Sequence, residues 1–207
     1  MSVDIVRAWV EGWTVSRATG RPVEEEWGLR VDVGQPGHLV RHVLPEATPA
    51  LLRRLAGTLT APGTWLKVCA PAEQVTPSLT AAWTVQVPEY LMTAPLRRTD
   101  VTAPAGYTLA VTPRGQIVTA RLLTADGEVA ARGQIALNGR TAVVDQVETA
   151  AGHRRRGLGS IVMRALSSAG AGRGARTGVL VATEEGRALY TTVGWRLHTP
   201  VTAAVLI

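Results

Sequence analysis

Residues 147–166 read VETAAGHRRRGLGSIVMRAL, and this stretch decides the fold. Three arginines, Arg154 to Arg156, run directly into Gly157-Leu158-Gly159. Apolar residues then recur with the i, i+3, i+4, i+7 spacing of a helix that buries one face, which predicts a helix over residues 157–171. The apolar stripe consists of Leu158, Ile161, Val162, Ala165, Leu166 and Ala169. A surface arginine cluster needs no glycines behind it, and an ordinary helix start needs neither feature.

An anion-binding loop explains the combination. The first amides of a helix lack intrahelical acceptors and carry the positive end of the helix dipole, so they favour an anion. Gly157 and Gly159 expose the backbone, and glycine adopts the φ values that such a loop requires. Arg154, Arg155 and Arg156 add charge-assisted hydrogen bonds. We therefore predict a diphosphate site on the amides between Arg155 and Ser160, a range that includes Leu158.

Two common phosphate motifs do not fit. The P-loop requires a leading glycine and a Gly-Lys-[Ser/Thr] ending, which are absent, and the Rossmann fingerprint requires a parallel βαβ unit. Here the preceding segments predict hairpins, because Ala125-Asp126-Gly127 and Asn138-Gly139 are turn sequences between β-rich runs. Three antiparallel strands in a meander therefore precede the loop.

A third pattern fits. Arg154-x-x-Gly157-x-Gly159 resembles the [QR]-x-x-G-x-[GA] signature of the GNAT acyltransferase family, whose loop holds the pyrophosphate of acyl-CoA. Residues 179–195, VLVATEEGRALYTTVGW, resemble the second signature of that family: a strand, a polar cap, a helix that ends in Leu-Tyr, and Gly-aromatic. The resemblance covers residues 105–207 and implies an α/β (α+β) GNAT fold, with a mixed, mostly antiparallel sheet flanked by helices.

The resemblance also implies roles for residues. Backbone groups of Val147, Glu148 and Thr149 would pair with the pantetheine arm of the acyl donor, and Tyr190 would protonate the departing thiolate. Thr183 stands where the family often has asparagine at the start of the helix that carries the tyrosine; threonine is a competent N-cap.

The implied chemistry is direct attack of an amine on a thioester, with an oxyanion stabilised by a backbone N–H near Thr149. A base must take the proton of the amine. Asp145, on the strand that ends at the thioester, is the first candidate and Glu148 the second. A solvated or ion-paired carboxylate is the alternative role for each, and His153 is expected to be a loop residue.

The first half of the chain reads as a separate α/β unit. Helical spacing over residues 4–17, β-rich runs at 28–33 and 38–44, a helix with Thr48 as N-cap, and a strand at 64–70 precede a Pro-containing linker at 94–106. We expect domains at 1–95 and 104–207. The family usually has two helices between its first two strands, whereas residues 106–122 leave room only for a short turn. The first half, packed alongside as a degenerate second copy of the fold, is expected to supply the missing wall of the acceptor site and to bind no CoA.

Composition and charge limit the classes of protein to which the chain can belong. The chain has 207 residues, 46% hydrophobic and 18% charged, with a net charge of +6. Lys67 is the only lysine, an arginine bias typical of a GC-rich bacterial genome. Neither a signal peptide nor an apolar run of about 20 residues is present, and Cys69 is a lone cysteine expected to be buried, so a cytoplasmic protein without membrane contact is expected.

The sequence therefore predicts an acyl-CoA-dependent N-acyltransferase, with acetyl-CoA as donor, a small-molecule or peptide amine as acceptor, and no metal. A non-catalytic module that binds acyl-CoA for regulation or structure is the alternative. A nucleic-acid binder is disfavoured, because one short arginine cluster without interleaved aromatic residues is a weak footprint. Residues 201–207, VTAAVLI, are a candidate edge strand for a homodimer.

Overall fold

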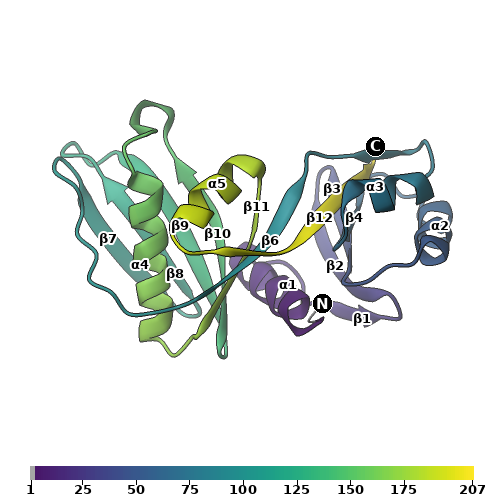
Figure 1. The fold of residues 1–207 in the computed structure, drawn as a ribbon, viewed down its shortest axis with the longest axis horizontal. Helices are drawn as coiled ribbons and strands as arrows, with labels where there is room; N and C mark the ends of the chain where they lie inside the picture. The colour runs from purple at the N-terminus through teal and green to yellow at the C-terminus, as the bar shows by residue number, and fades with distance from the viewer. Residues whose placement is uncertain (1–2) are drawn as a thin grey trace. The chain divides into compact units, whose positions relative to one another are not determined.

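The computed structural model describes residues 3–207, which form five α-helices, two short 3₁₀ helices and twelve β-strands (Figure 1). The mixed α/β class is confirmed. The chain divides into two compact units: the first runs to Met92 and takes in Val181–Glu184 and Leu197–Ile207, and the second consists of Thr93–Leu180 and Glu185–Arg196. The expected domains, 1–95 and 104–207, stay a prediction about the two halves of the sequence.

The first unit is built on a mixed sheet in the order β1-β2-β3-β4-β12, with β5 also paired to β12. Strands β3 and β4 run parallel, and the other pairs are antiparallel. Its elements are α1 (Val3–Arg17), β1 (Val23–Glu25), β2 (Gly28–Gln35), β3 (His38–Leu44), α2 (Pro49–Thr58), β4 (Thr64–Val68), α3 (Ala72–Val75), β5 (Trp83–Val85) and β12 (Arg196–Leu206).

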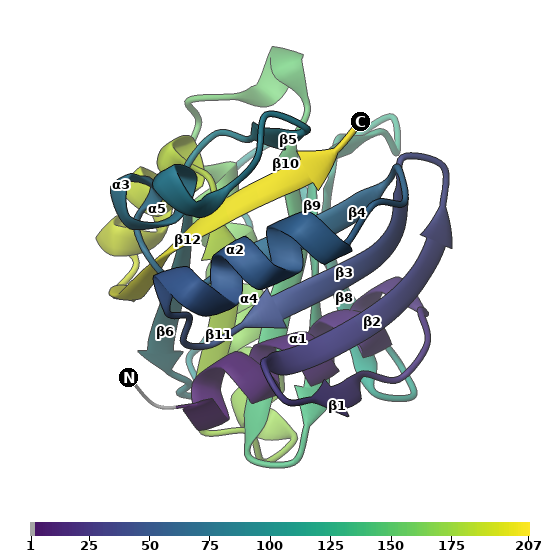
Figure 2. The same cartoon turned by 90° about the vertical axis from the view of Figure 1, so that its right-hand side faces the viewer.

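Helix α2 begins where the sequence predicts. The Thr48 hydroxyl accepts the Leu51 N–H at 3.2 Å, and Pro49 occupies the first helical position, where its missing N–H costs nothing. The helix lies across the sheet (Figure 2) and buries Leu52 and Leu55 in a core with side chains of β3, β4, β5 and β12.

Strand β12 corrects one expectation. Ala204 pairs with Leu66 of β4 and also with Val85 of β5, so the strand has a neighbour on each side. The segment 201–207 is therefore not a free edge for a second copy, because its backbone groups are already used within the chain.

The opposite face of this sheet meets α1. Trp9 and Trp13 are buried there, and the Arg41 guanidinium carbon lies 3.9 Å from the Trp13 ring centre. On the same face, the ammonium group of Lys67 donates to both carboxylate oxygens of Glu89, at 2.7 and 2.6 Å. The buried Lys67–Glu89 ion pair thus lies on the same face of the sheet as Trp13 and Arg41.

The second unit is a meander with one parallel addition, in the order β11-β10-β9-β8-β7. Positive φ angles of 83° at Gly127 and 58° at Gly139 make the two predicted hairpin turns, and a short turn also joins β7 to β8, as expected. Its elements are β7 (Thr108–Arg114), β8 (Ile117–Leu123), β9 (Val129–Asn138), β10 (Thr141–Thr149), α4 (Leu158–Gly172), β11 (Thr177–Ala182) and α5 (Glu184–Thr192), and β6 (Glu89–Pro95) carries the chain into this unit.

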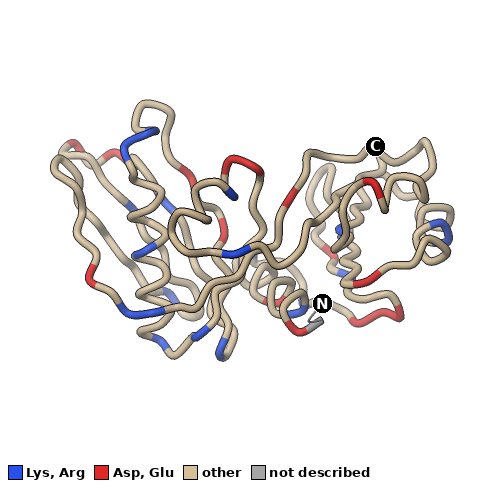
Figure 3. The backbone as a smooth tube through the Cα atoms, in the orientation of Figure 1, with Lys and Arg blue, Asp and Glu red and all other residues tan. Residues whose placement is uncertain are grey.

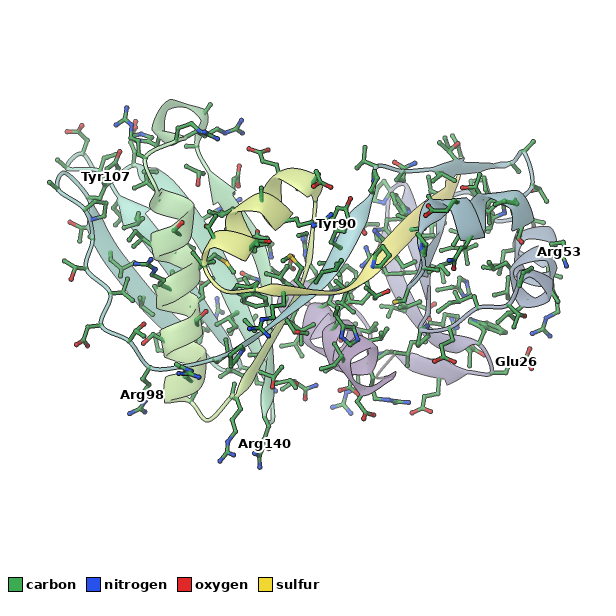
Figure 4. The ribbon with its side chains drawn as sticks, viewed as in Figure 1. Glu26, Arg53, Tyr90, Arg98, Tyr107 and Arg140 are labelled. Atoms are coloured by element: carbon green, nitrogen blue, oxygen red, sulfur yellow. The ribbon has the colours of Figure 1, made fainter. Side chains whose placement is uncertain are left out.

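Helix α4 packs against β8, β9 and β10, and Figure 1 shows it across one face of this sheet. The approach is close at Gly133, where an added Cβ would lie 3.0 Å from side-chain atoms of Val147 and Val162. The linker after β6 runs back along α4. Arg98 donates to the Gly172 carbonyl at 2.8 Å at the far end of the helix (Figure 4).

Candidate active site

A β-bulge interrupts β10 at the predicted site. The pairing with β9 shifts between Asp145 and Glu148, and Gln146 adopts a φ of 55°. The Asp145 carboxylate accepts the Gln146 N–H at 2.9 Å, which supports this left-handed residue. Bulges re-aim side chains and end pairing, and they often lie beside active sites.

Beyond the bulge, β10 pairs with one strand in place of two among residues 3–207. The parallel register with β11 ends at Val143↔Val179, whereas the antiparallel pairing with β9 continues to Thr149↔Ala131. The edge of Val147–Thr149 that faces away from β9 therefore offers backbone groups to an extended ligand. This is the geometry that the resemblance implies for a pantetheine arm.

The loop before α4 leaves most, but not all, of the amides predicted to bind a diphosphate without a partner in the described residues. Arg155 and Gly157 have φ angles of 61° and 74°, and Gly157 is the N-cap. The Ser160 N–H donates to the Gly157 carbonyl at 3.1 Å, so it is not free for a ligand. In residues 3–207, the amides from Arg155 to Gly159 have no recorded acceptor, and these five remain available.

The three arginines are exposed and differ in their contacts. Figure 3 shows basic residues of the loop before α4 in blue. Arg154 Nε donates to the Thr149 carbonyl at 3.3 Å, which ties the loop to the end of β10. Arg156 donates to the Tyr107 hydroxyl at 3.1 Å. The Arg155 side chain has no partner in the described part of the chain.

Tyr107 is a residue that sequence reasoning missed (labelled in Figure 4). Its hydroxyl lies 2.9 Å from His153 Nδ1 and accepts from Arg156, and the rings of Tyr107 and His153 meet edge to face with centres 5.7 Å apart. A lone tyrosine that precedes β7 carries no sequence signal for this contact, because it is 46 residues from His153. His153, expected to be a loop residue, ends a one-turn 3₁₀ helix (Ala151–His153) in the segment between β10 and α4, and its contact with Tyr107 helps to hold this segment.

The glycine at position 159 serves packing. A Cβ there would lie 2.8 Å from Leu189 Cδ2, so its absence lets α5 approach the first turn of α4. A Cβ at Gly157 would meet open space, which leaves the positive φ as the reason for glycine at that position.

Tyr190 is buried on α5 at 9% exposure, with its ring centre 6.4 Å from that of Trp195. Burial raises the pKa of Tyr190 to about 12, and the negative charge of Asp145 adds to the shift. The phenol is therefore protonated at neutral pH, and the charge of the predicted base, Asp145, helps to keep it protonated.

The two candidate bases differ in setting. Asp145 is partly buried at the bulge, whereas Glu148 is 63% exposed and pairs with Arg132 of β9 at 3.0 Å.

Thr183 is the single residue between β11 and α5, and its interaction with pantetheine stays a prediction. Within residues 3–207, neither a group of three metal-ligating side chains nor a helix long and apolar enough to cross a membrane is found.

This fold and this loop define an acyl-CoA N-acyltransferase architecture. A sequence profile described as the Acetyltransferase (GNAT) family matches residues 73–195, more than half of the chain, and the chain belongs to that family. No protein of curated function matches the chain.

Solved structures share the fold, two of those named here across nearly the whole chain. A GCN5-related N-acetyltransferase from Kribbella flavida has a TM-score of 0.66 at 17% identity, over 99% of this chain and 95% of its own. A GCN5-related N-acetyltransferase-like protein from Streptococcus suis 89/1591 has a TM-score of 0.59 at 12% identity, over 99% and 98%. A tandem GNAT protein from the clavulanic acid biosynthesis pathway has a TM-score of 0.51 at 14% identity, over 68% and 63%.

Proposed function

We propose that this protein transfers an acetyl group from acetyl-CoA to a primary amine, by direct attack of the amine while both substrates are bound. The observation that carries the proposal is the pairing of an open β10 edge with five unpaired loop amides at the start of α4. Extended pantetheine fits the first feature and a diphosphate fits the second. Acetyl-CoA would supply the thioester whose carbonyl carbon accepts the amine.

The chain's own groups then have separate tasks. Loop amides and Arg154–Arg156 bind the diphosphate, and the open edge at Val147–Thr149 orients the arm, so that proximity lowers the barrier. A backbone N–H near Thr149 stabilises the negative charge on the carbonyl oxygen. Asp145 accepts the proton that the amine nitrogen loses, directly or through water.

Tyr190 is assigned to the leaving group. Because its pKa is about 12, the phenol keeps its proton until the carbon–sulfur bond breaks. Such a weak acid stabilises a departing thiolate mainly through the hydrogen bond that its O–H donates, and complete proton transfer is uphill. We therefore expect a smaller effect of Tyr190 than the ~10²–10⁴-fold of an ideal general acid.

The first half of the chain is assigned to the acceptor side. It lacks a glycine loop of this kind, and the short β7–β8 turn leaves the second unit without the two helices that usually wall the acceptor site. The idea that the first half is a degenerate second copy of the fold is part of this proposal. A homodimer, if formed, must use a surface other than β12.

The experiment is a screen of amines with acetyl-CoA that follows release of free thiol, alongside calorimetric titration of CoA. We expect acetyl-CoA binding and at least one amine that raises thiol release above hydrolysis. Binding without transfer to any amine would favour a non-catalytic acyl-CoA module. The absence of CoA binding would overturn the site itself.

A further inference from the structure

A cavity of about 260 Å³ lies in the second unit, away from the loop described above. Its walls come from the linker after β6, the middle of α4 and the segment that follows α5. The lining includes the apolar side chains of Met163, Val193 and Trp195 and the basic side chains of Arg97 and Arg164. Thr99 and Ser167 contribute hydroxyl groups.

The two arginines are available for a ligand. Neither guanidinium group has a hydrogen-bond or ion-pair partner within residues 3–207, and no carboxylate is among the lining residues. The planar fork of arginine binds carboxylates and phosphates through two parallel hydrogen bonds. An oxyanion is therefore the group that this part of the wall recognises.

The wall that carries Arg97 is held in place on both sides. The Leu96 N–H donates to the Arg176 carbonyl at 2.8 Å. Beyond Arg97, the Thr99 N–H donates to the Ser168 hydroxyl at 3.0 Å, and that hydroxyl donates to the Thr99 carbonyl at 2.7 Å. The backbone of Arg97 is thus fixed along α4 while its side chain stays unpaired.

The apolar wall is equally well defined. Trp195 is 3% exposed, and its amide donates to the Tyr190 carbonyl at 3.0 Å. A Cβ at Gly178 would lie 2.7 Å from the Trp195 ring, so that glycine lets the indole pack closely against β11. The more accessible apolar lining comes from the partly buried Val193 and the exposed Pro95, which an apolar body of a ligand can contact.

The cavity is separate from the proposed CoA site. At a rise of about 1.5 Å per residue, Arg164 is about 9 Å and Ser167 about 13 Å along α4 from Leu158. The volume is below the ~300–1,000 Å³ of sites for drug-sized ligands, so a small ligand fits. We propose that this cavity binds a small organic anion, with Arg97 and Arg164 binding its carboxylate and the apolar lining around Val193 contacting its apolar body.

Benzoate is the probe, with benzamide as its neutral counterpart and inorganic phosphate as an anion without an apolar body. The readout is the indole ¹⁵N–H shift of Trp195, assigned with Trp195→Phe and followed in the full-length protein. We expect saturable binding of benzoate, with benzamide and phosphate weaker by roughly tenfold or more.

Arg97→Gln/Arg164→Gln should weaken benzoate binding by a similar factor. Arg121→Gln is the matched control, because Arg121 is an exposed arginine on β8 outside the cavity lining, and it should bind benzoate as the wild type does. All these side chains are exposed, and circular dichroism confirms folding. Equal binding of benzamide and benzoate, unchanged binding by the double variant, absence of benzoate binding, or displacement of benzoate by CoA would each overturn the proposal.

Discussion

At the scale of single residues, we expect Tyr107 to affect the affinity for CoA and Tyr190 to affect kcat. Tyr107→Phe removes the hydroxyl that contacts Arg156 and His153 and leaves the loop amides less well ordered. We expect CoA affinity to fall about three- to tenfold, consistent with ~1 kcal/mol for a lost hydrogen bond, at little change in kcat. Calorimetry and saturation kinetics measure the two quantities.

Tyr190→Phe should do the reverse. We expect kcat to fall by about 10- to 100-fold because the thiolate loses its hydrogen-bond donor, with CoA affinity nearly unchanged. A Tyr190→Phe enzyme with wild-type kcat would assign the buried phenol a packing role only.

Substitution of the two loop glycines, Gly157 and Gly159, provides a second test at the scale of single residues. Gly159→Ala places a methyl group 2.8 Å from Leu189 Cδ2, the end of a partly buried side chain that can shift, and we expect a loss of about 1 kcal/mol in the free energy of unfolding, at the low end of what overpacking costs. Gly157→Ala meets open space but must hold a φ of 74°, which costs about 1–2 kcal/mol.

Urea unfolding measures both losses of stability. In a Leu189→Ala background, Gly159→Ala should cost less stability than it does in the wild type, whereas the cost of Gly157→Ala should not change. If the Leu189→Ala background left both costs unchanged, the packing role of Gly159 would be contradicted.

At the scale of elements, the Lys67–Glu89 pair connects β4 to β6. Its side chains are 6% and 22% exposed. Burial lowers the pKa of Lys67 and the charge of Glu89 opposes that shift, so each charge depends on the other. Lys67→Met leaves a carboxylate without its partner, and we expect a loss of about 3–5 kcal/mol in the free energy of unfolding.

Lys67→Met/Glu89→Leu should be close to the wild type, since no unpaired charge remains. Chemical denaturation of the three proteins tests this. Additive losses in the double variant would show that the two side chains do not act as a pair.

The same sheet face carries a pH-dependent element. Burial lowers the pKa of His38 to about 4, and the positive charges of Arg41 and Lys67 contribute, followed by that of Arg17. Since the ordinary value is 6.5, the unfolded chain binds the proton more readily between pH 6.5 and 4. The stabilisation is complete above pH 6.5 and is lost as the pH falls toward 4.

His38→Gln provides the control, because its side-chain carbonyl still accepts the Arg41 N–H that now reaches His38 Nε2 at 3.2 Å, and it does not titrate. We expect the stability difference between pH 7 and pH 4.5, from urea unfolding, to be smaller in the variant. An identical difference would exclude His38 as a contributor.

At the scale of the whole molecule, the last strand links the two halves of the sequence. Residues Val201–Leu206 are buried, and β12 takes its partners β4 and β5 from the first 92 residues. A chain that begins at residue 96 leaves both sides of this apolar strand unpaired. We expect that fragment to aggregate, as unprotected hydrophobic strands do.

Size-exclusion chromatography of fragment 96–207 beside the full chain tests this prediction. A monomeric, folded fragment with full acetyl transfer would contradict it, and would also remove the first half from the acceptor site.

Local features were predictable because neighbouring residues decide them. The Thr48 cap, the hairpin turns at Gly127 and Gly139 and the start of α4 at the glycine loop depend on φ preferences and on the spacing of apolar side chains, which the sequence displays directly. The prediction of the GNAT fold came from the resemblance of two local segments, residues 154–159 and 179–195, to the signatures of that family.

Only the tertiary structure decided the contacts between distant segments. Tyr107 on His153, Lys67 on Glu89, β12 between β4 and β5, and the cavity lined by Arg97 and Arg164 each join residues far apart in the chain. These contacts depend on how the strands pair and on which side chains become buried together. The periodicity of the sequence encodes neither.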